Sequence, residues 1–178
     1  MKRPKIDIDE VRELVSASGF TFPEAVYVVA IRGYYKNSMG KPGVNDRGIY
    51  DDAIILIAPN YYQTFNANTD PAKYRPGIGT IAPGLHYYRK GKHGISRRNP
   101  YDAFRPATPD ESLPGYRDGQ SGIKKIYNPN IHSGGLNTVN SEACQTIYQP
   151  QWLEFQKTAY KLMDYEGQRL LPYLLIEK

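Results

Sequence analysis

The sequence contains a single cysteine, Cys144, among 178 residues. One thiol cannot form a disulfide within the chain, so we expect the fold to be held together by its hydrophobic core. A composition that is 40% hydrophobic and 23% charged suits one globular domain able to bury such a core. A lone thiol is either a small buried hydrophobe or a reactive group, and its neighbours indicate which.

Long hydrophobic runs are also missing. The longest apolar stretches, residues 26–31 and 53–58, are far shorter than the roughly 20 residues needed to cross a bilayer. The basic residues 1–5 are followed by a charged segment at 6–13 instead of the apolar stretch of a secretory signal. We therefore expect no membrane insertion, and synthesis in the cytoplasm without a signal peptide.

Acidic residues are outnumbered, with 18 Asp and Glu against 23 Lys and Arg, for a formal net charge of +5. This charge favours an anionic partner, and both nucleic acid and bacterial wall polymers qualify. The most basic run, residues 89–98, is more typical of a solvated loop than of a binding surface. The 16 tyrosines suit stacking on bases or sugars, or packing within sheets. No glycine-rich phosphate loop of the Gly-x-x-x-x-Gly-Lys-Ser/Thr type is present.

Short apolar segments separated by turn formers predict a single domain over residues 1–178, mainly β with flanking helices. A helix is expected within residues 1–20, where Asp7 and Glu10 have the spacing of a capping box. The predicted strands cover residues 25–32, 52–58, 61–67, 85–90 and 170–176, the second and third forming a hairpin. Residues 91–122 have no regular periodicity and predict a long irregular insertion.

The C-terminal segment, residues 150–178, predicts a helix followed by a strand. Apolar residues recur at helical spacing before Gly167, which favours a core-facing helix. These residues are Trp152, Phe155, Ala159, Leu162 and Met163. Pro172 predicts that the last strand lies at an edge or contains a bulge.

The segment 130–147 brings a histidine and the thiol together across a glycine-rich turn. Cys144 would be the nucleophile and His132 its base, because an imidazole that titrates near 6.5 can accept a thiol proton at neutral pH. The carbonyl of Ser133 could orient the second ring nitrogen. Ser141 would shape a tight turn in which the N–H groups of Ala143 and Cys144 form an oxyanion site.

The motifs Ile-His-Ser-Gly at 131–134 and Ser-Glu-Ala-Cys at 141–144 resemble the signature of the L,D-transpeptidase catalytic domain, with its β-sandwich or barrel fold. The resemblance implies that His132 is the general base, Ser133 its orienter and Cys144 the nucleophile, with Ser141 in the turn. It covers about residues 53–147, and only the last eighteen are specific. The family usually has His-Gly before the cysteine, where this chain has Glu142 and Ala143.

The segment that contains these two motifs also resembles phage and prophage lysis proteins, or endolysins. That resemblance implies hydrolysis of the peptide part of peptidoglycan, by a monomer released to the periplasm or cell wall without a signal peptide. It implies no cofactor and no nucleic acid partner. A toxin of the same chemistry, delivered into competing cells, fits the sequence equally well.

Further candidates lie outside the central motif. The substrate's carboxylates could bind His93, Arg97 and Arg105, since arginine recognises carboxylate with two parallel hydrogen bonds. Glu142 and Gln145, on either side of the thiol, are also candidate substrate contacts.

A zinc site of His86, His93 and His132 is disfavoured, because no pair has the spacing of a helical metal motif. The pair Asp51 and Asp52 is disfavoured as an acid–base pair, because adjacent strand residues point to opposite faces. The alternative to an enzyme is a binding module for cell wall or nucleic acid that uses the basic and tyrosine-rich surface.

Overall fold

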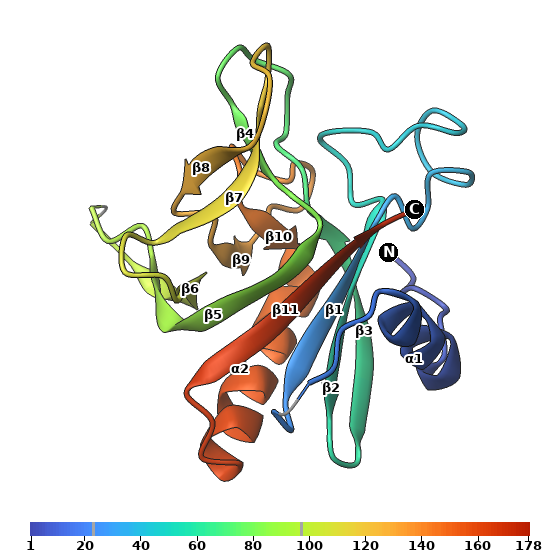
Figure 1. Ribbon diagram of the computed structural model, residues 1–178, viewed down its shortest axis with the longest axis vertical. Coiled ribbons are helices and arrows are strands. Elements are labelled where there is room, and N and C mark those ends of the chain that lie inside the picture. Colours follow the sequence, from blue (N-terminus) through green and yellow to red (C-terminus); the bar gives the residue numbers. More distant parts are fainter. Residues whose placement is uncertain (23, 97) are drawn as a thin grey trace.

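The structure, a computed structural model, describes residues 1–22, 24–96 and 98–178. Within these residues it contains two helices, α1 (Ile8–Ala17) and α2 (Gln149–Tyr165), and eleven strands (Figure 1). The strands are β1 (Tyr27–Arg32), β2 (Asp52–Ala58), β3 (Tyr61–Asn68), β4 (Gly79–Ile81), β5 (Gly84–His93), β6 (Tyr101–Pro106), β7 (Ser112–Arg117), β8 (Lys124–Tyr127), β9 (Ile131–Ser133), β10 (Gln145–Ile147) and β11 (Leu170–Glu177). The prediction of a mainly β fold with flanking helices is confirmed.

Eight of the strands form a closed barrel in the order β1-β11-β5-β6-β9-β10-β3-β2. The pairs β1–β11 and β9–β10 are parallel, and the other neighbours are antiparallel. A separate sheet, β4-β7-β8, stands beside the barrel (Figure 1). The hairpin predicted at residues 52–67 is confirmed as β2 and β3, which pair from Asp52↔Ala67 to Ala58↔Tyr61.

The two helices cover different surfaces of the barrel wall. Alternate β2 residues such as Ile54 join the main core cluster, which includes Phe155 and Met163 of α2. The intervening residues, such as Ile55, pack in a second cluster with Val11 of α1. Because both faces are covered, all seven residues of β2 are buried.

Both helices begin and end close to where the sequence predicts. The side chain of Asp7 accepts hydrogen bonds from the N–H groups of Asp9 and Glu10, which confirms the capping box. Helix α1 begins after this cap and occupies only part of residues 1–20. Helix α2 ends just before Gly167, whose φ of 62° is left-handed. The core-facing residues Trp152, Phe155, Ala159 and Met163 are buried as predicted, and Leu162 packs at the edge of the core.

The prediction of an irregular insertion at residues 91–122 is wrong. This segment contains the end of β5 and the whole of β6 and β7. Strand β6 pairs with β5 and β9, and β7 lies between β4 and β8. Pro106 ends β6, and Pro114 and Gly115 lie inside β7, so these residues hide the periodicity of both strands.

The prediction that Pro172 places the last strand at an edge or in a bulge is also wrong, because β11 is enclosed between β1 and β5 and pairs with β5 without interruption from Leu170↔Arg89 to Leu175↔Gly84. The strand accommodates Pro172 because its ladder with β1 begins one residue later, at Val28↔Tyr173. Neither helix in the described part of the chain is long and apolar enough to cross a membrane.

Candidate active site

The thiol and the imidazole are brought together by the parallel pair β9–β10. His132 lies in the middle of β9, and Cys144 directly precedes β10. The N–H of Gln145 donates to the carbonyl of Asn130 over 2.8 Å, which fixes the start of β10 against the start of β9. The loop 134–144 therefore leaves β9 and returns beside it, with Cys144 next to His132.

Tyr50 holds the first part of that loop. Its buried hydroxyl donates to the carbonyls of Gly135 and Thr138, at 2.7 and 3.0 Å. Gly134 passes so close to Tyr50 that a Cβ at this position would overlap the hydroxyl oxygen. The glycine at 134 is therefore required by this close approach.

The geometry of His132 and Cys144 suits a nucleophile and its base. The ligand atoms of Cys144, His132 and His93 all lie within 4.8 Å of one another. His132 is 3% exposed, and its Nδ1 lies 2.7 Å from the carbonyl oxygen of Ser133. A carbonyl only accepts hydrogen bonds, so in this contact Nδ1 carries the proton and the neutral ring keeps a lone pair on Nε2. The hydroxyl of Tyr101 lies 3.2 Å from the same Nδ1.

His93, a candidate contact for substrate carboxylates, lies directly against His132. The two imidazole rings stack with centroids 3.9 Å apart and planes 19° from parallel. The side-chain amide nitrogen of Asn130 donates to Nδ1 of His93 over 3.2 Å. His93 and Tyr101 are register partners at the end of the β5–β6 pair, which delivers both rings to His132.

The turn before Cys144 is held from inside the protein. Ser141 is buried and its hydroxyl donates to the carbonyl of Cys144 over 2.7 Å, as expected for a residue that shapes the turn. Gln145 donates to the carbonyl of Ala143 and accepts from the hydroxyl of Tyr173. Gln145 is fully buried, so its side chain offers no surface to a substrate and instead supports the turn.

Two of the remaining predicted contacts, Arg105 and Glu142, are already engaged in ion pairs. Arg105 is only 8% exposed and forms a two-armed ion pair with Glu111, which raises the pKa of its guanidinium. Its carboxylate partner is therefore part of the protein rather than of a substrate. Glu142 is exposed and pairs with Arg75 over 2.8 Å. Arg97 lies outside the described residues.

In the part of the chain that the structure describes, His93, His132 and Cys144 form a group that could hold a metal ion. His86 does not belong to it. Its Nε2 bonds the carbonyl of Ala82, and burial lowers its pKa. The three-histidine zinc site is therefore not formed, and a cysteine takes the third position.

A groove leads along the surface to the turn of Cys144. It consists of two adjoining cavities of about 410 Å³ each, on either side of the ion pair between Arg75 and Glu142. Lys73 and Arg117 also line it, and Ala143 lies at one end. The groove therefore combines positive charge with direct access to the neighbour of the thiol.

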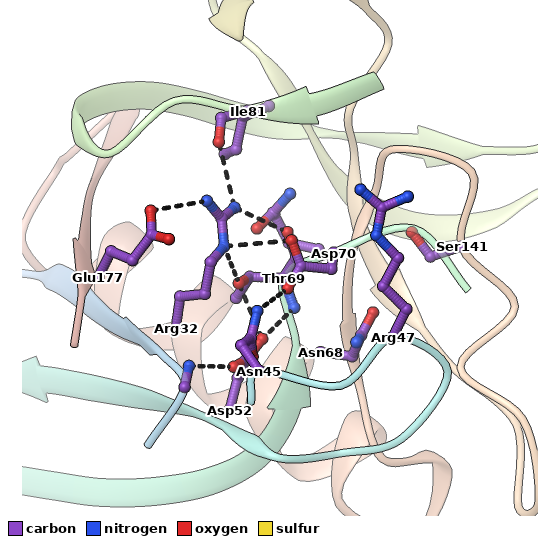
Figure 2. Close-up of polar contacts among 12 residues, drawn as sticks. Arg32, Asn45, Arg47, Asp52, Asn68, Thr69, Asp70, Ile81, Ser141 and Glu177 are labelled. Atoms are coloured by element: carbon purple, nitrogen blue, oxygen red, sulfur yellow. Dashed lines mark hydrogen bonds and ion pairs between the residues drawn. The ribbon is translucent and has the colours of Figure 1, made fainter. Parts of the chain in front are cut away.

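The wall of this groove is anchored by a polar group that we name the Arg32 cluster (Figure 2). It comprises the buried residues Arg32, Asp52, Thr69 and Asp70 and the exposed residue Glu177. The guanidinium of Arg32 donates to the side chain and carbonyl of Thr69, at 3.0 and 2.9 Å, and to the carbonyl of Ile81, at 3.1 Å. It also pairs with Asp70 over 3.3 Å. These bonds fix both ends of the segment that carries the groove wall.

The carboxylates predicted at Asp51 and Asp52 are both fully buried and bind backbone N–H groups. Asp52 accepts from Gly33 and Thr69, each at 2.6 Å. Asp51 accepts from Asp46 at 2.8 Å. Burial raises the pKa of Asp51 to about 6 and also raises that of Asp52. Both act as structural anchors of the loops beside the barrel.

The chain matches no protein-family model, and comparison with curated proteins and with solved structures found no match.

Three residues of the site escaped prediction from the sequence. Tyr101 and Asn130 bond the two histidines, and the carbonyl of Asn128 lies 3.6 Å from the sulfur of Cys144. Asn130 and Asn128 lie just before His132, in a stretch whose Asn-Pro-Asn pattern signals only a turn. Tyr101 depends on a strand pairing that the sequence does not indicate.

Proposed function

We propose that this protein is a cysteine-dependent enzyme that cleaves a peptide bond in the stem peptides or cross-links of peptidoglycan. The observation that carries the proposal is the arrangement of Cys144 beside a histidine whose Nδ1 is held by the carbonyl of Ser133. A cysteine nucleophile requires a base of this kind, with its ring fixed by a third group. The resemblance to L,D-transpeptidases and phage endolysins supplies the substrate class.

The proposed reaction has two steps. Nε2 of His132 accepts the thiol proton, and the thiolate of Cys144 attacks the peptide carbonyl carbon to form a thioester. The leaving amine takes the proton back from the imidazolium as the carbon–nitrogen bond breaks. Water then attacks the thioester with His132 as base, and the carboxylic acid and the free thiol are released. Throughout, Ser133 keeps Nδ1 protonated.

The position of the groove supports an anionic, extended substrate. The stem peptides of peptidoglycan carry several carboxylates, which Lys73 and Arg117 in the groove lining would attract. The N–H groups of Ala143 and Cys144 would stabilise the oxyanion of the tetrahedral intermediate. We place the action of the enzyme in the periplasm or cell wall, as in an endolysin, with water as the acceptor.

Mass spectrometry of soluble muropeptides released from purified peptidoglycan tests this proposal. The wild type should release new peptide-cleaved products, and Cys144→Ala and His132→Ala should release none. Leu136→Ala serves as the matched control, because Leu136 is 58% exposed in the same loop and should leave the products unchanged. Thermal unfolding of each variant separates loss of chemistry from loss of fold.

Products that persist in Cys144→Ala would refute the cysteine mechanism. If neither the wild type nor any variant releases products, the alternative function is that of a binding module. Tyr116 and Tyr127 favour that alternative, since they are 48% and 55% exposed on the sheet β4-β7-β8 beside Lys125. Cosedimentation with purified walls at several salt concentrations would then measure its binding, which should weaken as salt is raised.

A further inference from the structure

The cluster of His93, His132 and Cys144 has the chemistry of a transition-metal site. Two imidazoles and one thiolate form a ligand set that suits zinc and related ions. A tetrahedral zinc ion with Zn–N bonds of about 2.0–2.1 Å and a Zn–S bond of about 2.3 Å separates its ligand atoms by about 3.3–3.6 Å. The three ligand atoms here lie within 4.8 Å of one another, so shifts of about 1 Å by side-chain rotation close the site.

The other ring nitrogen of each histidine already has a partner. Metal-binding histidines usually donate that N–H to a carbonyl or carboxylate, which fixes the ring. In His132 this partner is the carbonyl of Ser133, 2.7 Å from Nδ1. In His93 it is the side-chain amide of Asn130, 3.2 Å from Nδ1. His132 can therefore direct the lone pair of Nε2 toward a metal, whereas His93, whose Nδ1 accepts from the amide, must first move its proton from Nε2 to Nδ1.

The amide of Asn130 provides a second, independent observation. Asn130 is 4% exposed, and among the described residues its Oδ1 has no hydrogen-bond partner. A half-turn of the amide exchanges its two ends, so that Oδ1 accepts a hydrogen bond from the N–H at Nδ1 of His93. His93 would then carry its proton on Nδ1 and offer the lone pair of Nε2, which is the state that a metal requires.

We propose that a thiophilic divalent ion, with zinc as the representative, binds His93, His132 and Cys144 and reversibly blocks the nucleophile. The metal takes the thiolate and the Nε2 lone pair, which are the two groups that acyl transfer needs. The inhibitory part of the inference rests on the proposed function, whereas the binding part does not.

Reversibility follows from the arrangement of the rings. The planes of His93 and His132 are 19° from parallel, and lone pairs on nearly parallel rings do not converge on one ion. One ring must tilt on binding, and this reorganisation lowers the affinity below that of a preformed structural site. His93 is the last residue of β5, so its ring can turn with little change to the barrel. Cys144 is partly exposed, which gives an ion access.

Titration of the metal-free protein with Co²⁺ tests the binding part, because a cobalt–thiolate bond gives a charge-transfer absorption band. The wild type should bind one equivalent with this band, and Cys144→Ala should lose the band. His93→Gln should bind at least about tenfold more weakly, and so should Asn130→Ala, which removes the partner of His93. His86→Gln is the matched control and should bind as the wild type does.

Equal affinity in the wild type and His93→Gln, or the absence of the band in the folded wild type, would overturn the metal site. For the inhibitory part, muropeptide release is measured in buffered free Zn²⁺, each variant relative to its own metal-free rate. The free Zn²⁺ concentration that halves release by the wild type should equal the dissociation constant of Zn²⁺ measured by competition with Co²⁺. Halving release by His93→Gln should need at least about tenfold more Zn²⁺. Release that rises with Zn²⁺ would refute inhibition. A wild type without activity in chelator would contradict the proposed function, while the Co²⁺ titration would still decide whether the metal binds.

Discussion

The buried carboxylate of Asp51 should make the protein less stable as the pH rises. Its side chain is fully buried, one oxygen accepts from the N–H of Asp46, and the other has no hydrogen-bond partner among the described residues. Burial raises its pKa in the folded state to about 6, from an ordinary value of 3.8. The folded state therefore holds this proton more tightly than the unfolded chain does, and stability falls as the pH rises between these two values.

The substitution Asp51→Asn removes the buried charge and keeps an oxygen to accept from Asp46. One pKa unit corresponds to about 1.4 kcal/mol, so the shift at Asp51 corresponds to about 3 kcal/mol at a pH above both values. The stability of the variant relative to wild type should therefore increase by about 2–3 kcal/mol between about pH 4 and about pH 8. Urea denaturation at a series of pH values measures this difference directly.

The exposed residue Asp110 provides a control of opposite sign. Its hydrogen bond with Lys125 lowers its pKa to about 2, so its contribution is present above the ordinary pKa and is lost in acid. Asp110→Asn should therefore lose stability relative to wild type as the pH rises. A relative stability of Asp51→Asn that stays flat with pH, or that falls, would show that the Asp51 carboxylate is not desolvated as the structure indicates.

Three further substitutions test the packing around the site by urea denaturation. Arg32→Met leaves the buried carboxylate of Asp70 without its cation and should cost about 3–5 kcal/mol, whereas Arg12→Met, which breaks an exposed pair, should cost less than about 1 kcal/mol. Phe155→Ala empties space in the main core and should cost about 3–5 kcal/mol. Gly134→Ala places a methyl group on the Tyr50 hydroxyl and should cost about 1–3 kcal/mol. A loss below about 0.5 kcal/mol in Arg32→Met, Phe155→Ala or Gly134→Ala would contradict the contact described for it.

The parts of the fold that the sequence predicts are those determined by local patterns. The β2–β3 hairpin has two apolar segments around the turn at residues 59–60, and α2 has apolar residues at helical spacing. Strands β6 to β10 are only three to six residues long, and half of their pairings join strands that do not follow each other in the chain. No local signal distinguishes such strands from loops. The enclosed position of Pro172 also lacks a local signal, because it depends on where β1 begins to pair with β11.

The candidate site also has one part that the local sequence predicts and one part that it does not. One short parallel pair, β9–β10, brings His132 and Cys144 together, so a single segment of sequence contains enough information to predict their proximity. The neighbours His93 and Tyr101 come from the far end of the β5–β6 pair, within residues 91–122, where the sequence predicts an irregular insertion. The sequence consequently indicates a nucleophile and a base, but it does not indicate that a second imidazole stacks on the first.

That second imidazole is what distinguishes the two chemical states proposed for the site. Nε2 of His132 has one lone pair, which can accept the proton of Cys144 or bind a metal, but not both. The base needs only the carbonyl of Ser133 behind it, whereas the metal also needs His93 and the amide of Asn130. Asn130→Ala should therefore weaken Zn²⁺ inhibition without changing the position of the thiol. If Asn130→Ala instead reduced metal-free activity and Zn²⁺ sensitivity in equal proportion, His93 would serve the catalytic arrangement itself rather than a separate metal-bound state.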